Sequence, residues 1–236
     1  MNLLETKNLT KQYGKHVVVN QLNLTIAAGK LTAYLGTNGA GKSTTIQMLT
    51  HTLTPSSGEI CSSNSLAMGV VFQNSVLDTE LTVWDNLVLR GALYKDVTKE
   101  HLIALMQRTG ISAFSQQKYG QLSGGMRRKV DITRALINQP TILFLDEPTT
   151  GLDPNARKEL WGLLNQLKQN GVAIFLTTHY LEEAESADYI YILEKGTILE
   201  EGTAHSLKEK YQQPSIRLLS HQISVLEKHL KNYSII

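Results

Sequence analysis

The chain has 236 residues, of which 42% are hydrophobic and 19% are charged, a composition typical of a globular protein that folds in water and buries one large core. Lys and Arg number 23 against 21 Asp and Glu, and this net charge of +2 gives no field that would indicate a nucleic-acid-binding protein. The single cysteine, Cys61, excludes an internal disulfide framework and a multi-cysteine zinc site.

The apolar runs are too short for membrane spans, which need about 18 residues. The N-terminus has neither a basic start followed by an apolar stretch nor a small-residue cleavage site, so it lacks the pattern of an export signal. We therefore expect the chain to remain inside the cell, tethered to a membrane only through a partner.

The first third of the chain predicts strands, a glycine loop and a helix. Short β-prone runs separated by turns predict strands at 3–9, 17–19, 22–26 and 31–35. A helix is expected from Lys42 to about Thr50. Residues 55–58 then break the chain before a strand at 68–72.

The middle of the chain predicts helices. Helical periodicity runs from Leu81 to Leu93, and again around Leu102, so residues 74–121 form a mainly helical lobe. A third helix from Ser123 is expected to end at Pro140.

The last third alternates strands and helices. A buried strand at 141–145, a helix from Asp153 to about 170 and a strand at 172–176 predict a parallel sheet with helices on its faces. Ligands of such sheets bind beyond the carboxyl ends of the strands. Residues 208–211 and 225–230 could be helical.

A phosphate-binding loop follows the strand at 31–35. Its eight residues are Gly36, Thr37, Asn38, Gly39, Ala40, Gly41, Lys42 and Ser43. They match the G-x-x-x-x-G-K-[ST] pattern between a strand and a helix, where backbone N–H groups and the helix dipole bind phosphate. Lys42 would contact the β- and γ-phosphates of ATP, and the Ser43 hydroxyl would bind Mg²⁺. Thr44, the next residue, is also assigned to the nucleotide site. The alternative is a glycine-rich turn without a ligand.

Two carboxylates follow the buried strand at 141–145. Asp146 would hold the Mg²⁺ shell through water, and Glu147 would act as general base on the attacking water. An Asp-Glu pair alone would suggest a helix cap or a solvated turn. Its position downstream of the phosphate loop favours the catalytic interpretation.

A second potential anion site precedes the helix at 123. Ser123, Gly124 and Gly125 present N–H groups at a helix start. Together with the preceding motifs, this segment resembles the ATP-binding cassette family, and the resemblance covers residues 3 to about 205. In that family the Leu-Ser-Gly-Gly-Gln signature loop binds the γ-phosphate of a nucleotide held by the partner subunit.

The resemblance implies an α/β fold with a P-loop NTPase core: a mainly parallel sheet, an N-terminal antiparallel β lobe and a helical lobe at about 74–138. Residues 1–210 would form the ATPase domain. Residues 211–236 would be a short tail to which the sequence assigns no role.

The resemblance also assigns further residues. Tyr13 is similar to the aromatic residue that stacks on adenine, and Gln73 to the glutamine that links the Mg²⁺ site to the membrane partner. Asp153 closes the loop that couples two subunits, and His179 resembles the histidine that contacts the γ-phosphate. Individually, Tyr13 is one of nine tyrosines, Asp153 is a good N-cap in any context, and a lone histidine is more often structural.

Two features depart from the family pattern. Met126 replaces the signature glutamine, as in one branch of bacterial exporters, while the three phosphate-contacting residues before it are intact. The segment between Lys42 and Gln73 is shorter than in most relatives, with residues 61–65 where a hairpin would lie.

The resemblance implies an ATP-hydrolysing subunit that powers export of a drug, antibiotic or peptide. Its partners would be a second copy of the chain and a separate permease, at the cytoplasmic face of the membrane. Alternatives are a soluble relative in DNA repair or translation, which would carry long coiled coils, zinc insertions or two cassettes, and a regulator that does not hydrolyse ATP. The basic run 127–129 lacks interleaved aromatic residues, which indicates a solvated helix face or a partner contact and not nucleic acid.

Overall fold

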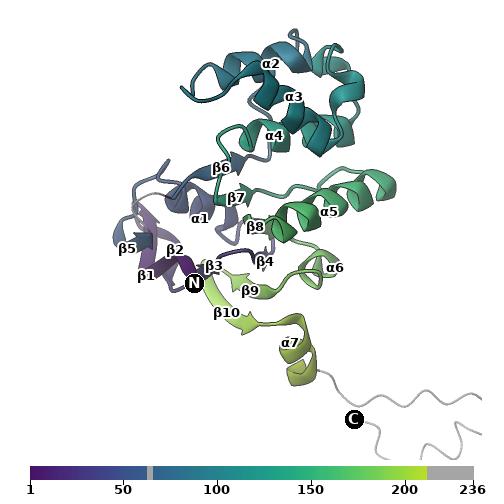
Figure 1. The fold of residues 1–236 in the computed structure, drawn as a ribbon. Helices are drawn as coiled ribbons and strands as arrows, with labels where there is room; N and C mark the ends of the chain where they lie inside the picture. Colours follow the sequence, from purple (N-terminus) through teal and green to yellow (C-terminus); the bar gives the residue numbers. More distant parts are fainter. Residues whose placement is uncertain (63–65, 212–236) are drawn as a thin grey trace, which may run out of the picture.

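The computed structural model describes residues 1–62 and 66–211, and a six-stranded sheet forms its centre (Figure 1). The strand order is β10 (Thr197–Gly202), β9 (Tyr189–Glu194), β4 (Leu31–Gly36), β8 (Ala173–Thr178), β7 (Ile142–Leu145) and β6 (Met68–Val71). Neighbouring strands are parallel except for the β9–β10 hairpin. Every residue of β7 and β8 is buried, which explains their uninterrupted runs of apolar and threonine side chains.

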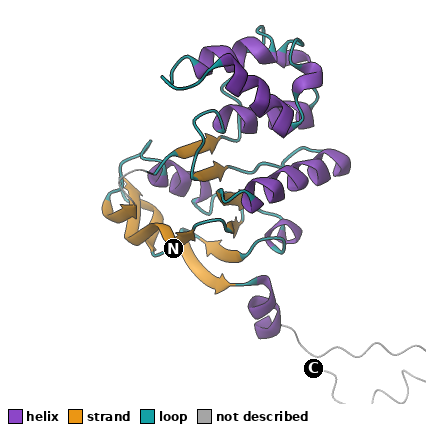
Figure 2. Cartoon of the chain, in the orientation of Figure 1, coloured by secondary structure: helices purple, strands orange, loops and turns teal. Residues whose placement is uncertain are grey.

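A smaller antiparallel sheet is built around β1 (Asn2–Tyr13). This strand pairs with β2 (His16–Leu22), β3 (Thr25–Ala27) and β5 (Ser57–Ser62). The small sheet lies beside the large one (Figure 2). A mainly parallel sheet with an adjoining antiparallel lobe and helices confirms the predicted fold class.

The helices form two groups (Figure 1). Helices α2 (Val83–Gly91), α3 (Lys99–Thr109) and α4 (Gly124–Ala135) lie together beyond the β6–β7 edge, with short 3₁₀ turns at Ser112–Phe114 and Tyr119–Gln121. Helices α1 (Lys42–Leu49), α5 (Pro154–Gln169) and α6 (Leu181–Ala184) accompany the large sheet, and α7 (Ala204–Tyr211) follows β10. The hydroxyls of Thr82 and Thr98 cap α2 and α3 by accepting hydrogen bonds from Asp85 and His101 N–H.

The large sheet separates two hydrophobic clusters because alternate side chains of a strand face opposite sides. Leu143 and Leu145 of β7 pack into the cluster that includes the helices α2 to α5. Ile142 and Phe144 pack on the other face, with α1 and the small sheet. No helix within residues 1–62 and 66–211 combines the length and apolarity needed to cross a bilayer.

Several element boundaries from the sequence are wrong; the strand predicted at 3–9, for example, runs from Asn2 to Tyr13. The helix predicted to run to Pro140 ends at Ala135, where β6 packs closely against its last turn: a Cβ on Gly69 would lie 2.4 Å from the Ala135 carbonyl oxygen. The strand predicted at 22–26 is divided between β2 and β3. The Thr6 hydroxyl, which donates to Leu22 O and accepts from Leu24 N, bridges the division.

Three strands were not predicted: β5, β9 and β10. The predicted chain break at 55–58 overlaps the start of β5, which pairs with β1. On the helical side, Leu89 and Leu93 do not belong to the buried face of α2, because their side chains are 60% and 67% exposed. The hairpin position at 61–65 lies partly, and the helix at 225–230 wholly, outside the described residues.

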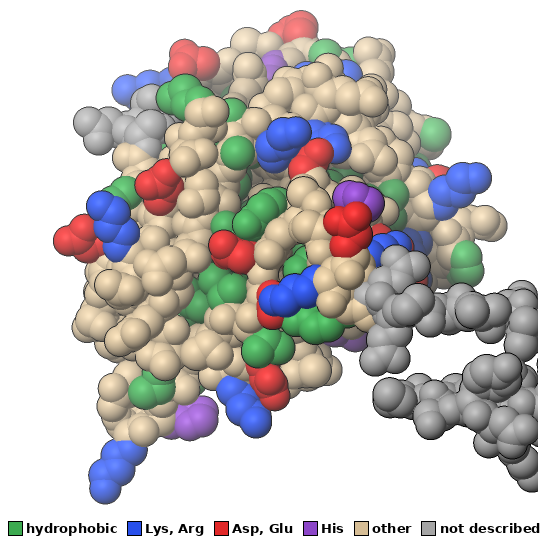
Figure 3. Space-filling view, turned by 90° about the horizontal axis from the view of Figure 1, so that it is seen from below, with side chains coloured by type: hydrophobic (Ala, Val, Ile, Leu, Met, Phe, Trp, Pro, Cys, Tyr) green, Lys and Arg blue, Asp and Glu red, His purple; other side chains and the backbone are tan. Residues whose placement is uncertain are grey.

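The face viewed in Figure 3 carries charged side chains of both signs, interspersed with hydrophobic ones. Such a mixed surface differs from the continuous basic stripe that tracks a phosphate backbone. This face therefore gives no support to a nucleic-acid interface.

Candidate active site

The phosphate loop joins β4 to α1 and leaves the start of that helix open. Gly39 and Gly41 have φ angles of 82° and 95°, and a Cβ on Gly41 would lie 2.7 Å from the Val18 carbonyl oxygen, so only glycine fits there. No side chain caps the N-terminus of α1. The first N–H groups of the helix thus face the loop, an arrangement that binds phosphate.

Lys42 lies beneath this loop and is 5% exposed. Its Nζ donates to the carbonyl oxygens of Gly36 at 2.8 Å and Thr37 at 3.1 Å. The same ammonium lies 3.1 Å from Glu147 Oε1. The structure therefore brings the loop lysine and the predicted general base into direct contact.

Asp146 and Glu147 leave the carboxyl end of β7 and are held by β8. The Thr177 hydroxyl donates to Asp146 Oδ1 at 2.6 Å and accepts from Glu147 N–H at 2.9 Å. Glu147 has a φ of 44°, which is uncommon for a non-glycine residue and typical of functional sites. This backbone conformation directs its carboxylate towards Lys42 rather than along the strand.

His179 follows the neighbouring strand β8 and faces the same carboxylate. Its Nδ1 lies 3.4 Å from Glu147 Oε2 without hydrogen-bonding geometry, and Thr150 Oγ1 donates to the same oxygen at 3.2 Å. The His179 ring packs against the Tyr180 ring, with centroids 4.0 Å apart and an angle of 40° between the ring planes. The histidine is thus fixed by its ring face while its Nδ1 points to the site.

One open cavity of about 600 Å³ contains most of these groups. It is lined by Val18, Asn38, Gly39, Gly41, Lys42, Ser43, Thr44, Gln73, Glu147, Thr150 and His179. Gly36, Thr37 and Ala40 belong to the same phosphate loop but are not among the residues that line the cavity. A site of this size suits a nucleotide-sized ligand.

The donors near this cavity fit Mg²⁺. Ser43 offers a hydroxyl oxygen, Gln73 an amide oxygen, and Asp146 a carboxylate that is 6% exposed. Mg²⁺ prefers such oxygen ligands, and it is bound by one or two carboxylates together with substrate phosphates rather than by an all-protein cage. The described residues accordingly contain no cluster of three or more His, Cys, Asp or Glu side chains suited to a metal.

Besides Gly36, Thr37, Ala40 and Asp146, five more residues singled out in the sequence lie outside the lining of this cavity. Ser123 caps α4 by accepting from Met126 N–H at 3.3 Å, and Asp153 caps α5. Gly124 lines a second cavity, of about 540 Å³, and Gly125 packs against α5. Tyr13, at the end of β1, is 50% exposed and has Lys11 Nζ 5.1 Å from its ring centroid.

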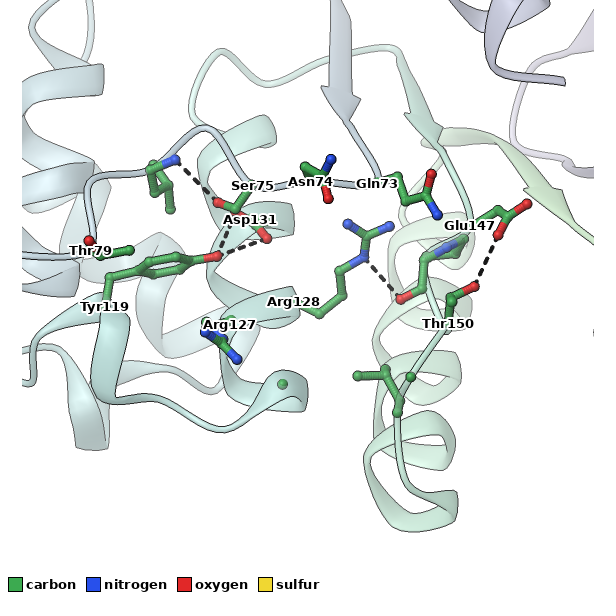
Figure 4. A pocket seen from close by; sticks show the side chains of 15 residues that line it. Gln73, Asn74, Ser75, Thr79, Tyr119, Arg127, Arg128, Asp131, Glu147 and Thr150 are labelled. Atoms are coloured by element: carbon green, nitrogen blue, oxygen red, sulfur yellow. Dashed lines mark hydrogen bonds between the residues drawn. The ribbon is translucent and has the colours of Figure 1, made fainter. Parts of the chain in front are cut away.

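The second cavity shares Gln73, Glu147 and Thr150 with the first (Figure 4). At its far end, Asp131 of α4 accepts hydrogen bonds from Ser75 Oγ at 2.6 Å and from the Tyr119 hydroxyl. Burial raises the pKa of Asp131 and raises the pKa of Tyr119 to about 12. The loop after Gln73 is thereby fastened to α4.

Arg128 corrects the interpretation of the basic run 127–129. Its guanidinium is 7% exposed and donates three bonds: Nη1 to Phe72 O at 2.6 Å, Nη2 to Asp146 O at 2.7 Å and Nε to Pro148 O at 2.9 Å. Burial lowers the pKa of Arg128. A solvated helix face would need exposed side chains, and of the three residues only Arg127 is exposed. Lys129 is half-buried and pairs with Glu159.

Comparison with known proteins agrees with this geometry. Residues 19–150 match the family model described as "ABC transporter". The Nod factor export ATP-binding protein I of Rhizobium johnstonii is 39% identical over 221 residues, covering 88% of this chain and 71% of that protein. The protein of the same name from Rhizobium sp. (strain N33) is 40% identical, covering 88% and 73%.

Solved structures give the same result. A crystal structure of a nucleotide-free ATP-binding cassette from an ABC transporter superposes with a TM-score of 0.81 at 25% identity, covering 91% of this chain and 96% of that one. A dimeric ATP-binding cassette in a post-hydrolysis state, bound to ADP and Pi, gives a TM-score of 0.76 at 27% identity, covering 86% and 99%.

Proposed function

The chain belongs to the ABC transporter family as an ATP-binding ATPase subunit, and we propose that it works as a homodimer that powers export through a separate membrane permease. The observation that carries the proposed chemistry is the meeting of Lys42, Glu147 and His179 at one cavity, beside the open start of α1. Groups that can bind phosphate, a general base and a histidine that can contact the γ-phosphate then surround the same point.

In the proposed reaction, the phosphates lie on the N–H groups of the loop 36–41, and Lys42 contacts the β- and γ-phosphates. The phosphate oxygens compete with Glu147 for the Lys42 ammonium. The released Glu147 carboxylate polarises the attacking water, and His179 contacts the γ-phosphate. Bound Mg²⁺, held by Ser43, Gln73 and Asp146, would neutralise developing charge on the phosphate oxygens.

The dimer is proposed because the two candidate phosphate sites are separate within one chain. The lining of the phosphate-loop cavity contains none of the residues 123–125. A second copy facing the first could place its Ser123, Gly124 and Gly125 over the nucleotide, with Asp153 near the junction and Tyr13 stacked on adenine. Dimeric cassettes among the similar structures support this arrangement.

The proposal of export rests on the descriptions of the similar proteins and on the signature-loop sequence. The relatives at 39–40% identity are described as export ATP-binding proteins, and the Met126 signature loop is similar to that of drug and antibiotic exporters. Exposed apolar side chains on the helical lobe, Val76, Leu89 and Leu93, offer a docking surface for the permease. The chain would thus lie at the cytoplasmic face of the membrane, and its cargo would be a drug, antibiotic or peptide.

Two substitutions test the ATPase proposal. Lys42→Ala should abolish ATP hydrolysis and weaken ATP binding, whereas Lys99→Ala, at an exposed lysine of α3, should change neither. Glu147→Gln should hydrolyse slowly and form a dimer with ATP and Mg²⁺, measured by light scattering. Unchanged steady-state hydrolysis in Lys42→Ala, or a monomeric Glu147→Gln at saturating ATP, would contradict the site and the dimer respectively.

The transport proposal needs its own experiment. The chain is expressed with and without a candidate permease, and the cells are fractionated. We expect membrane recovery only with the permease, and loss of export when Glu147 is changed to Gln. Equal cytosolic recovery in both strains, with unchanged export, would favour a soluble relative of the same fold.

A further inference from the structure

A buried carboxylate outside the cavity joins the two segments that carry Glu147 and His179. Glu183 lies on α6 and is 3% exposed. Its Oε1 accepts a hydrogen bond from the Thr149 hydroxyl, and its Oε2 accepts one from the Thr178 hydroxyl at 2.7 Å. Burying a carboxylate is unfavourable unless such bonds satisfy it.

The two threonines stand next to the reactive residues in the chain. Thr149 is the second residue after Glu147, and Thr178 immediately precedes His179. Both threonine side chains are almost fully buried, at 1% exposed. A single carboxylate therefore fixes the loop after β7 relative to the end of β8.

The start of α5 contacts the same carboxylate. Arg157 Nε lies 3.8 Å from Glu183 Oε1, and the Arg157 guanidinium lies over the Tyr180 ring at 5.3 Å. The Tyr180 ring in turn packs against the His179 ring at an angle of 40°. Asp153, at the proposed dimer junction, caps this helix, so the network connects α5 to both reactive segments.

Little regular structure restrains the loop after β7. Within residues 147–152, the backbone hydrogen bonds are Thr150 N to Glu147 O at 3.4 Å and Leu152 N to Thr149 O at 3.1 Å. The Thr177 hydroxyl holds the beginning of the loop. Downstream of that point, side chains determine where the loop lies, and the Thr149–Glu183 bond is one of these anchors.

We propose that Glu183 is a positioning residue for ATP hydrolysis, which sets the distance between the Glu147 carboxylate and the His179 ring through Thr149 and Thr178. The proposal rests on the ATPase function proposed above. Glu183 is not among the residues that line the 600 Å³ or the 540 Å³ cavity. Its loss should therefore alter the rate of hydrolysis and leave ATP affinity unchanged.

The test compares Glu183→Gln with Glu182→Gln, an exposed neighbour that serves as the matched control. Glutamine keeps the size of the side chain but loses the charge and one acceptor. We expect the kcat of Glu183→Gln to fall by about 10- to 100-fold, as for other small misplacements of reacting groups. Its Kd for ATP should stay within about twofold, and Glu182→Gln should match the unmodified chain.

A double-mutant cycle of Thr149→Val and Glu147→Gln distinguishes a role in positioning Glu147 from a role only in the stability of the fold. Thr149→Val keeps the side-chain shape and replaces the hydroxyl with a methyl group. In single-turnover measurements it should slow the unmodified enzyme by about tenfold, equivalent to about 1.4 kcal/mol, yet add little to Glu147→Gln, because the threonine acts through that carboxylate. The proposal would be overturned if Thr149→Val slowed the unmodified chain and Glu147→Gln by the same factor, or if the kcat of Glu183→Gln were unchanged.

Hydrogen exchange gives a readout that does not depend on hydrolysis. Amides in peptides covering 146–152 and 177–182 should exchange faster in Glu183→Gln than in Glu182→Gln, with the rest of the chain unchanged. Unaltered exchange in both peptides would contradict the positioning role even if the chain proved not to be an ATPase. Failure of the proposed function would instead appear as unchanged hydrolysis in Lys42→Ala.

Discussion

Changing Arg128 to lysine should destabilise the folded chain by about 2–4 kcal/mol, estimated from hydrogen-bond energies. The guanidinium donates to three buried carbonyl oxygens, those of Phe72, Asp146 and Pro148. Lysine keeps the positive charge, so the net charge does not change. Its ammonium is compact and cannot reach three oxygens that face a planar fork.

The magnitude follows from the bonds that lysine cannot form. Each hydrogen bond from a charged donor contributes about 1.5–3 kcal/mol, and lysine would retain one of three, which gives a loss of about 3–6 kcal/mol. Arg128 lines the 540 Å³ cavity, so water can enter and bond part of the exposed oxygens. That compensation lowers the expected loss to about 2–4 kcal/mol.

Urea unfolding followed by circular dichroism measures this loss. The control is Arg127→Lys at the adjacent exposed position, which should stay within about 0.5 kcal/mol of the unmodified chain. A loss below about 1 kcal/mol in Arg128→Lys, with an unchanged denaturant slope, would refute the argument that Arg128 anchors these segments.

Two further predictions concern the phosphate loop and acid stability. Gly41→Ala should weaken ATP binding by more than about tenfold, equivalent to about 1.4 kcal/mol, because the new Cβ would meet a carbonyl oxygen of β2 and the backbone there is left-handed. The control is Gly14→Ala, whose Cβ would meet nothing within 4 Å. Equal ATP affinity of the two variants in a fluorescent-nucleotide titration would be evidence against the loop geometry. Although burial raises it, the pKa of Asp188 is lowered overall by hydrogen bonds from a β4 amide and from Lys168. The unfolded chain therefore takes up the proton first, and the stabilisation is present above the ordinary Asp pKa of about 3.9 and lost as the pH falls through the lower folded value. Asp188→Asn should lose less stability than the unmodified chain below about pH 4 in urea titrations; parallel pH profiles would contradict this.

The sequence predicted the elements whose signals are local. The phosphate loop has a fixed spacing between a strand and a helix, and β7 is an apolar run that ends in two carboxylates. The β9–β10 hairpin also had a local signal that the sequence analysis missed. Lys195 and Gly196, with φ angles of 48° and 81°, form a two-residue turn between two β-prone runs, which is a strong hairpin signature.

Other features depend on partners far along the chain, and no local pattern could reveal them. A Cβ on Gly58 would lie 2.3 Å from the Asn8 carbonyl oxygen, so the glycine that suggested a break is required by close packing of β5 on β1. Arg128 bonds carbonyl groups that lie 18 to 56 residues away. The sequence of a basic run does not show whether its side chains face solvent or bond backbone oxygens.

The position of the reactive groups explains why such distant anchors matter. Parallel strands end at one edge of the sheet, which brings Glu147 and His179 together but leaves both on chain segments beyond regular hydrogen bonding. Thr177, Arg128 and Glu183 supply the missing restraints from β8, α4 and α6. Because α4 begins at the signature loop, a shift of that helix would move the Arg128 fork and with it the backbone on both sides of Glu147. Residues outside the lining of the phosphate-loop cavity can therefore couple the helical lobe to the proposed chemistry. The Arg128→Lys and Glu183→Gln variants separate the restraint that comes from α4 from the one that comes from α6.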